Sequence, residues 1–229
     1  MTSPLIIALD LNPKQAIDFA KKLNPEECKV KVGSQLFTSG GPKIIENLKG
    51  LGFDIFLDLK FHDIPNTVKE AVKSSIDLEV WMVNVHAQGG RDMLLAARES
   101  FEESSSSKKT FLIGVTLLTS LDDSYIKEMG FSYSLEQQVL NLARSCKEAS
   151  LDGVVCSPRE LPLLRKELGK DFILVTPGIR SSEDLKDDQK RTSTISDALS
   201  KGANYLVIGR EVTRSKNPSK KVKQILETI

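Results

Sequence analysis

Residues 54–61 of the chain read DIFLDLKF, a run in which apolar and charged side chains alternate. Successive side chains of a β-strand point to opposite faces of its sheet. One face of this run would carry Ile55, Leu57, Leu59 and Phe61, and the other Phe56, Asp58 and Lys60. The first face suits packing under helices. The second places opposite charges roughly 6–7 Å apart along the strand, which indicates a polar cavity beside it.

Similar short runs, most of them rich in Val, Ile, Leu or Phe, recur along the chain. They are Leu5–Asp10, Cys28–Gly33, Asp54–Lys60, Val80–Ala87, Thr110–Thr119, Gly153–Ser157, Phe172–Gly178 and Tyr205–Arg210. The stretches between them show helical spacing of apolar residues, as in Ala16, Phe19, Ala20 and Leu23, and again in Val139, Leu142, Ala143 and Cys146.

This alternation of strand and helix, eight times in 229 residues, predicts an α/β protein with a single (β/α)8 TIM barrel domain over residues 1–229. A doubly wound open sheet is the alternative. That fold usually has a G-x-G-x-x-G turn after its first strand, and none follows Asp10.

Composition narrows the class of protein. Lys and Arg number 32 against 31 Asp and Glu, and 40% of residues are hydrophobic, which is typical of a globular domain and not of a disordered chain. Without a basic excess, nucleic acid is not an expected partner.

The three cysteines form no C-x-x-C pair, which favours a reducing compartment. No basic, apolar leader opens the chain and no run reaches a membrane span, so we expect a cytoplasmic protein.

Polar residues gather where the expected strands end, and barrel chemistry is found at the carboxyl ends of strands. They are Asp10, Lys31, Asp58, Lys60, His86, Thr119, Ser157, Thr176 and Arg210, and Gly209 precedes the last of them. A single Asp–Lys pair in an apolar strand would more often be a structural ion pair. Four alternating charges on adjacent strands, from Asp10 through Lys31 and Asp58 to Lys60, favour a catalytic site instead, because buried ion pairs add little stability.

Two Gly–Arg segments follow the last two strands, Thr176–Arg180 and Gly209–Arg210. The loops after strands seven and eight commonly bind phosphate in this fold. Glycine allows close backbone approach and arginine offers a planar fork of donors. Only two histidines occur, which rules out a His-rich metal site but leaves a carboxylate magnesium site open.

The stretch Asp58–Thr67, DLKFHDIPNT, resembles the signature of orotidine 5′-phosphate decarboxylases. Further matching motifs occur in the same order along the chain: ALD at 8–10, KVG and LFT within 31–38, VHAQGG at 85–90, VTLLTS at 115–120, TPGIR at 176–180, DQKR at 188–191 and VIGR at 207–210. The resemblance spans nearly the whole chain and is nearest to the free-standing bacterial type.

That family decarboxylates orotidine 5′-monophosphate to UMP, the last step of de novo pyrimidine synthesis, as a homodimeric barrel without cofactor or metal. The resemblance makes Lys60 the proton donor and places Asp58 beside the substrate carboxylate. Lys31 and Asp10 would hold the ribose and complete the charged network. Thr119 would contact the pyrimidine. The remaining matches divide into residues that reach the partner subunit's site, Asp63, Ile64 and Thr67, and residues on the phosphate side, Arg180, Gln189, Gly209 and Arg210.

Two alternatives remain open. The nearer is a magnesium-dependent sugar-phosphate decarboxylase or lyase built on the same D-x-K-x-x-D skeleton. The farther is a nucleotide-binding barrel without catalysis. The chain also departs from many relatives after DQKR, where it reads TSTIS, and after Arg210, where it has Glu211 and Val212. These departures bear on phosphate binding and on closure of the 181–194 loop, which we expect to be mobile.

Overall fold

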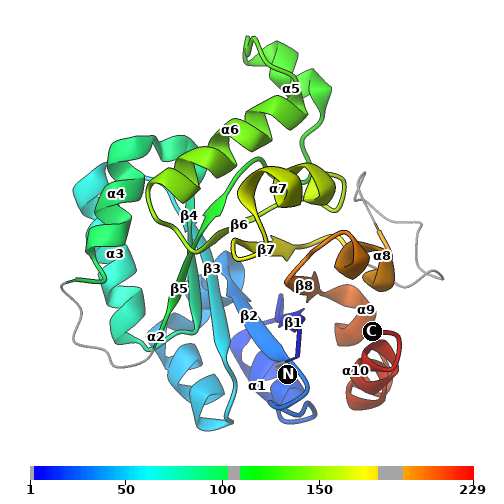
Figure 1. Ribbon diagram of the computed structural model, residues 1–229. Helices are drawn as coiled ribbons and strands as arrows, with labels where there is room; N and C mark the ends of the chain where they lie inside the picture. Colours follow the sequence, from blue (N-terminus) through cyan, green and yellow to red (C-terminus); the bar gives the residue numbers. More distant parts are fainter. Residues whose placement is uncertain (1–2, 103–108, 180–192) are drawn as a thin grey trace.

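The computed structural model describes residues 3–102, 109–179 and 193–229. In it, parallel strands follow one another around a closed barrel in chain order, and β1 pairs with β8 (Figure 1). They are β1 (Leu5–Ala8), β2 (Lys29–Gly33), β3 (Ile55–Phe61), β4 (Met82–His86), β5 (Phe111–Val115), β6 (Gly153–Val155), β7 (Ile173–Thr176) and β8 (Tyr205–Ile208). Each predicted run coincides with one of these strands, and only β3 extends beyond its run, by the single residue Phe61. The (β/α)8 prediction is confirmed, and closure excludes the open sheet.

Helices surround the barrel (Figure 1). They are α1 (Pro13–Ala20), α2 (Ser34–Gly50), α3 (Pro65–Asp77), the 3₁₀ turn η1 (Ala87–Gly89), α4 (Arg91–Glu99), α5 (Asp123–Glu128), α6 (Leu135–Glu148), α7 (Leu161–Leu168), α8 (Ile195–Ser200), α9 (Arg210–Thr213) and α10 (Pro218–Leu226). Local sequence sets their starts, as at α1, where the Asn12 side chain accepts a hydrogen bond from the Gln15 amide and Pro13 occupies the first turn. Both predicted apolar stripes are buried.

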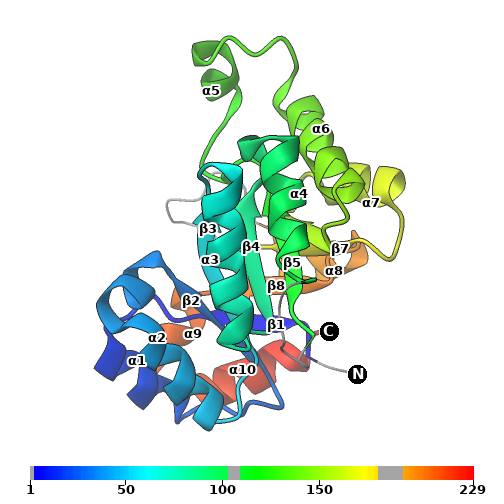
Figure 2. The same cartoon turned by 90° about the vertical axis from the view of Figure 1, so that its left-hand side faces the viewer.

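The sheet separates two groups of buried apolar side chains, one on each of its faces. Ile55 and Leu57 belong to the large core between the strands and the helices, while Phe56 packs inside the barrel with residues such as Ile6 and Met82. The helices that cover β3 and β4, α3 and α4, lie side by side (Figure 2), whereas α5 stands away from the barrel. Leu59 and Phe61 pack against the large core, and Asp58 and Lys60 face the cavity described below, so the predicted alternation of faces is confirmed along β3.

The pairing of β4 with the second half of β3 is nevertheless irregular. Leu57 pairs with Val83, but the next paired residues are Phe61 and Val85, so three residues of β3 lie opposite the single residue Asn84. Within this bulge Lys60 has a φ of 54°. Few residues with a Cβ adopt this left-handed conformation. The bulge sits beside the cavity described below, where such irregularities often redirect a side chain.

Aromatic side chains close the amino end of the barrel. The ring of Trp81 meets Phe111 edge-on at 5.8 Å and Tyr205 at 4.9 Å between centroids. The Nζ of Lys29 lies 5.0 Å from the Trp81 ring and 5.4 Å from that of Tyr205, and it donates to the Ser3 carbonyl at 3.0 Å. A buried cation–π cluster thus seals this end.

In the part of the chain that the structure describes, no helix is long and apolar enough to cross a membrane. The run Ser104–Ser107, whose composition is typical of a surface loop, lies outside the described residues. So does the 181–194 loop apart from its last two residues. Thr194 caps α8, since its side chain accepts a hydrogen bond from the Asp197 amide.

Candidate active site

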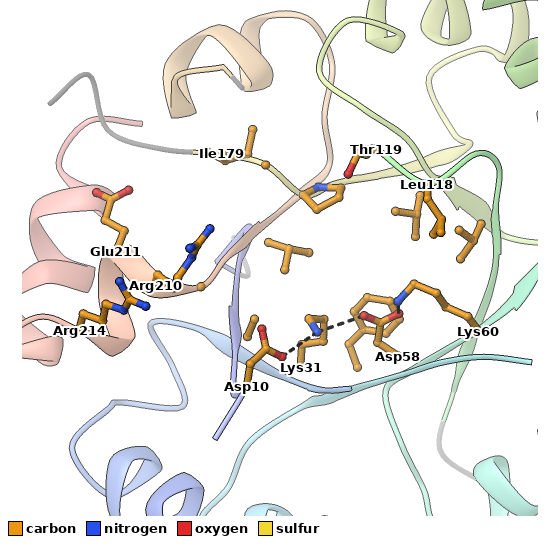
Figure 3. Close-up of a pocket in the computed structure, with 18 of the residues that line it drawn as sticks. Asp10, Lys31, Asp58, Lys60, Leu118, Thr119, Ile179, Arg210, Glu211 and Arg214 are labelled. Carbon is orange, nitrogen blue, oxygen red and sulfur yellow. Dashed lines mark hydrogen bonds and ion pairs between the residues drawn. The ribbon is translucent and has the colours of Figure 1, made fainter. Parts of the chain in front are cut away.

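A cavity of about 950 Å³, here called the barrel cavity, opens at the carboxyl ends of the strands. Seven of the predicted site residues line it: Asp10, Lys31, Asp58, Lys60, Thr119, Gly209 and Arg210. They come from strands and loops distant in the sequence, and barrel closure brings them together. Figure 3 shows the charged side chains of β2 and β3 on one side of this space and Arg210 on the other.

Four charges form a continuous chain along one wall. The Nζ of Lys31 lies 3.4 Å from a carboxylate oxygen of Asp10 and 3.1 Å from one of Asp58. The other oxygen of Asp58 lies 2.6 Å from the Nζ of Lys60 (Figure 3). Asp58 is only 7% exposed, so its two lysine partners compensate for the loss of water around the carboxylate.

The network favours the charged forms of its two central members, Lys31 and Asp58. Burial opposes the charge on Lys31, but Asp58 and Asp10 outweigh burial, and the pKa of Lys31 lies above its usual value of 10.5. Burial likewise works to raise the pKa of Asp58, yet Lys31 and Lys60, together with the hydrogen bond from Asn84, hold that pKa below its usual value of 3.8. Both shifts favour the charged forms of Lys31 and Asp58, the two central members of the network.

Asn84 completes the network, and the sequence analysis missed it. Its Nδ2 donates to the Asp58 carboxylate at 2.7 Å, and its Oδ1 accepts from the Lys60 backbone amide at 2.8 Å. The side chain is fully buried in the middle of β4. The available signal was an amide inside the otherwise apolar run Met82–Val85, on the face that also carries His86.

Arginine side chains lie across the cavity from Lys60. Arg210 and Arg214, at the start and the C-cap of α9, line it together with Gly178 and Gly209, and Arg210 points into it (Figure 3). Beside them Glu211 forms an ion pair with Lys221 of α10 at 2.9 Å. Two other predicted phosphate residues, Arg180 and Gln189, lie outside the described residues.

The three residues expected to serve a partner subunit do not line the cavity of their own chain. Asp63, Ile64 and Thr67 lie in the exposed run His62–Thr67 that follows β3. Ile64 is 67% exposed, although it is a large apolar side chain. The carboxylate of Asp63 accepts a hydrogen bond from the Ile64 amide at 2.7 Å.

His62, the first residue of this run, packs against His86, with ring centroids 5.4 Å apart. Burial, with His62 and Lys60 nearby, lowers the pKa of His86 below its usual 6.5. Its buried Nδ1 has no hydrogen-bond partner among the described residues. Within residues 3–102, 109–179 and 193–229, no group of three or more His, Cys, Asp or Glu side chains is placed to hold a metal ion.

The model of the orotidine 5′-phosphate decarboxylase / HUMPS family matches residues 3–225. The chain belongs to this family. Among its members, the orotidine 5′-phosphate decarboxylase of Hahella chejuensis is 49% identical over 226 residues, which cover 98% of this chain and 96% of that one. The decarboxylase of Nitrosomonas eutropha is 51% identical, with 99% and 97% of the two chains covered.

Crystal structures of family members agree with the fold described above. That of orotidine 5′-phosphate decarboxylase from Lactobacillus acidophilus superposes with a TM-score of 0.88 at 35% identity, covering 99% of this chain and 98% of that one. The enzyme from Pyrococcus horikoshii gives a TM-score of 0.78 at 25% identity, with 98% of each chain covered. The family resemblance inferred from DLKFHDIPNT and the motifs around it is thus confirmed.

Proposed function

We propose that this protein decarboxylates orotidine 5′-monophosphate to UMP and CO2, with Lys60 as the cationic stabiliser and proton donor. One observation carries the proposal beyond family membership. The Lys60 ammonium lines the barrel cavity, and Asp58 holds it at 2.6 Å. The close relatives carry the name of this activity, which favours it over the sugar-phosphate chemistry and over a barrel that only binds nucleotide.

Decarboxylation at C6 would be favoured by a cation held at that carbon. When the bond between C6 of the pyrimidine and its carboxylate breaks, CO2 leaves and the electron pair stays on C6 in an orbital that the ring cannot delocalise. An ammonium group at that carbon stabilises the developing charge and then donates a proton to it, giving UMP. Lys60 next takes a proton from solvent, and the cycle closes.

Asp58 and Lys31 hold this cation in place. Asp58 would lie beside the substrate carboxylate, and its charge is balanced by both lysines. Because the charges are fixed before substrate binds, little reorganisation is needed as the transition state forms. Lys31 and Asp10 would contact the ribose hydroxyls, and Thr119 the pyrimidine.

Arg210 and Gly209, across the cavity from Lys60, would bind the phosphate group. Arg180 and Gln189 would join them from the 181–194 loop. Phosphate is distant from the reacting carbon, so its binding energy can act on the reaction only by fixing the substrate and closing this loop over it. A forked arginine is suited to this contact.

The direct test is the ultraviolet loss of orotidine 5′-monophosphate, measured for the wild type and for Lys60→Ala in excess EDTA. We expect rapid conversion to UMP by the wild type and a loss of about 10⁴-fold or more in the variant, with an unchanged far-UV CD spectrum. Turnover that EDTA abolishes would point to the magnesium-dependent alternative. Binding of UMP without any turnover would point to a non-catalytic barrel.

We also propose that two chains form a homodimer with shared active sites. Two features of the exposed run His62–Thr67 support this proposal. The large apolar side chain of Ile64 is exposed to solvent, and Asp63 and Thr67 do not line the cavity of their own chain. Mixing inactive Lys60→Ala with Asp63→Ala should restore part of the activity, since each hybrid would contain one site with both residues intact. Proven subunit exchange without recovery contradicts the shared site.

Residues 1–229 would act as one catalytic domain, without a cofactor, in the cytoplasm. The three cysteines are buried and free, which suits a reducing compartment. The substrate is the only partner proposed besides the second copy of the chain; neither nucleic acid nor membrane is required.

A further inference from the structure

Asn84 links two of the proposed catalytic residues, Asp58 and Lys60, at the irregular part of β3. A carboxylate only accepts hydrogen bonds and a backbone amide only donates, so the orientation of the Asn84 side chain is fixed: Nδ2 faces Asp58 and Oδ1 faces the Lys60 amide. Both distances, 2.7 and 2.8 Å, are those of well-formed hydrogen bonds. One fully buried amide therefore satisfies a side chain and the main chain at once.

The Asn84 side chain accepts a hydrogen bond that the backbone of β4 does not accept at this point. Between the Leu57–Val83 and Phe61–Val85 pairs, three residues of β3 face Asn84 alone, so the regular ladder is interrupted. The Lys60 amide would lose its partner there, and Asn84 supplies one. The same stretch holds Lys60 at a φ of 54°, a conformation that persists only where its surroundings fix it.

Asn84 does not line the barrel cavity, so it does not touch a bound nucleotide. We propose that Asn84 is a positioning residue: it holds the left-handed backbone of Lys60 and the carboxylate of Asp58 so that the ammonium group stays at the reacting carbon. This inference rests on the proposed function and concerns the rate of the chemical step. Substrate binding depends on other residues and should be left nearly intact.

The first test is Asn84→Ala, assayed for decarboxylation and, separately, for UMP binding by calorimetry. Misplacing a reacting group by about 1 Å costs on the order of 10²-fold in rate. We expect kcat to fall by about 10²-fold, while KM and the Kd for UMP change less than threefold. The wild type, assayed in parallel, tests the proposed function itself: if it does not turn over, that function has failed, whereas an active wild type leaves Asn84 under test.

A matched control separates positioning from general stability. Thr110 is also a buried polar residue, and its hydroxyl donates to the Val80 carbonyl at 2.7 Å near the opposite end of the barrel. Thr110→Val should lower the melting temperature, as Asn84→Ala does, and leave kcat within twofold of the wild type. If both variants lower Tm and neither lowers kcat more than threefold, Asn84 is structural and the inference is wrong.

Asn84→Asp gives a second, independent test that does not depend on the alanine variant folding. When protonated, the introduced carboxyl can donate to Asp58 and accept from the Lys60 amide, as the native amide does. When ionised, it faces the Asp58 carboxylate, and like charges at such a distance raise the pKa of the pair. The rate of this variant relative to the wild type should therefore rise as the pH falls.

Other groups near this position are Asp58, Lys60, Lys31, His62 and His86, and the wild type contains them all. The ratio of the two rates between pH 5 and 9 thus isolates the introduced carboxyl. An increase of at least tenfold toward low pH is expected. A ratio that stays flat across this range contradicts the positioning role.

Discussion

Two lysines of β2 occupy equivalent places at opposite ends of the barrel. Lys29 and Lys31 are two residues apart, both point inward, and both are largely withdrawn from solvent. Lys31 meets two carboxylates and its pKa is raised. Lys29 meets two aromatic rings and a carbonyl; burial lowers its pKa, although Asp54 opposes the shift.

The difference shows that the partners of a buried lysine decide whether its pKa is raised or lowered. Carboxylates hold Lys31 charged and fixed at the cavity, where the proposed chemistry needs a constant field. Lys29 instead lies against two aromatic rings and donates to a carbonyl, so the same residue type becomes part of the aromatic cluster at the amino end. The two residues share their type and their strand, so their neighbours make the distinction. These are Asp10 and Asp58 for Lys31, and Trp81 and Tyr205 for Lys29.

The largest expected effect comes from removing the charge at each end in turn. Lys31→Met should lower kcat/KM by about 10³-fold, because Asp58 loses one of its two cations and the fixed field at the cavity is weakened. Lys29→Met, a change of the same kind in the same strand, should leave kcat/KM within twofold. Steady-state kinetics on both purified variants checks this. Equal losses in the two variants would remove the functional distinction between the ends.

The aromatic cluster at the amino end, formed by Trp81, Phe111 and Tyr205 with Lys29, should contribute to stability and not to catalysis. Trp81→Leu removes the edge-on ring contacts with Phe111 and Tyr205 and the face above which Lys29 lies. We expect the free energy of unfolding to fall by about 2–3 kcal/mol. Urea unfolding measures it, with kcat on the folded fraction as control. A large fall in kcat at unchanged stability would contradict the assignment.

Among residues at the carboxyl end of the barrel, the loss of kcat/KM on substitution should be smaller for those farther from Lys60. Arg210→Ala removes a charged donor on the far side of the cavity and should lower kcat/KM by about 10²-fold, the value of a good charge-assisted contact. The reaction at C6 is untouched. A substrate lacking the phosphate should therefore react equally slowly with the variant and the wild type. An unchanged kcat/KM for the full substrate would exclude Arg210 from phosphate binding.

The smallest effect expected is a difference in alkaline stability. The pKa of Lys29 is lowered in the folded state, so the unfolded chain binds more protons just below pH 10.5, and Lys29 adds stability as the pH rises toward that value. The pKa of Lys31 is raised, so the stability it contributes is present below pH 10.5 and is lost as the pH rises above it. The two lysines therefore act with opposite signs.

Thermal unfolding of the wild type and the two methionine variants between pH 8 and 11.5 would reveal this. The Tm advantage of the wild type over Lys29→Met should grow up to about pH 10.5, and its advantage over Lys31→Met should shrink above that pH. Parallel curves for the two variants would show that the ends do not differ in this respect.

Several features were accessible from the sequence because they are local. Alternation within 54–61 placed Phe56 and Asp58 inside and Ile55 and Leu57 outside, and the structure agrees. The recurrence of strand and helix predicted the barrel, since parallel strands require crossovers that alternate with them. The DLKFHDIPNT motif, a contiguous run of residues, identified the family.

The tertiary structure alone decided the features that depend on partners across strands. The bulge at Lys60 arises where β3 and β4 lose register, and neither strand signals it in isolation. Asn84 could be read as a polar residue in an apolar strand, but its two bonds exist only because β3 brings Asp58 and Lys60 to it. Lys29 and Lys31 look alike in the sequence. Barrel closure gives one of them rings and the other carboxylates, because non-local packing assigns the partners that set the energy of a buried charge.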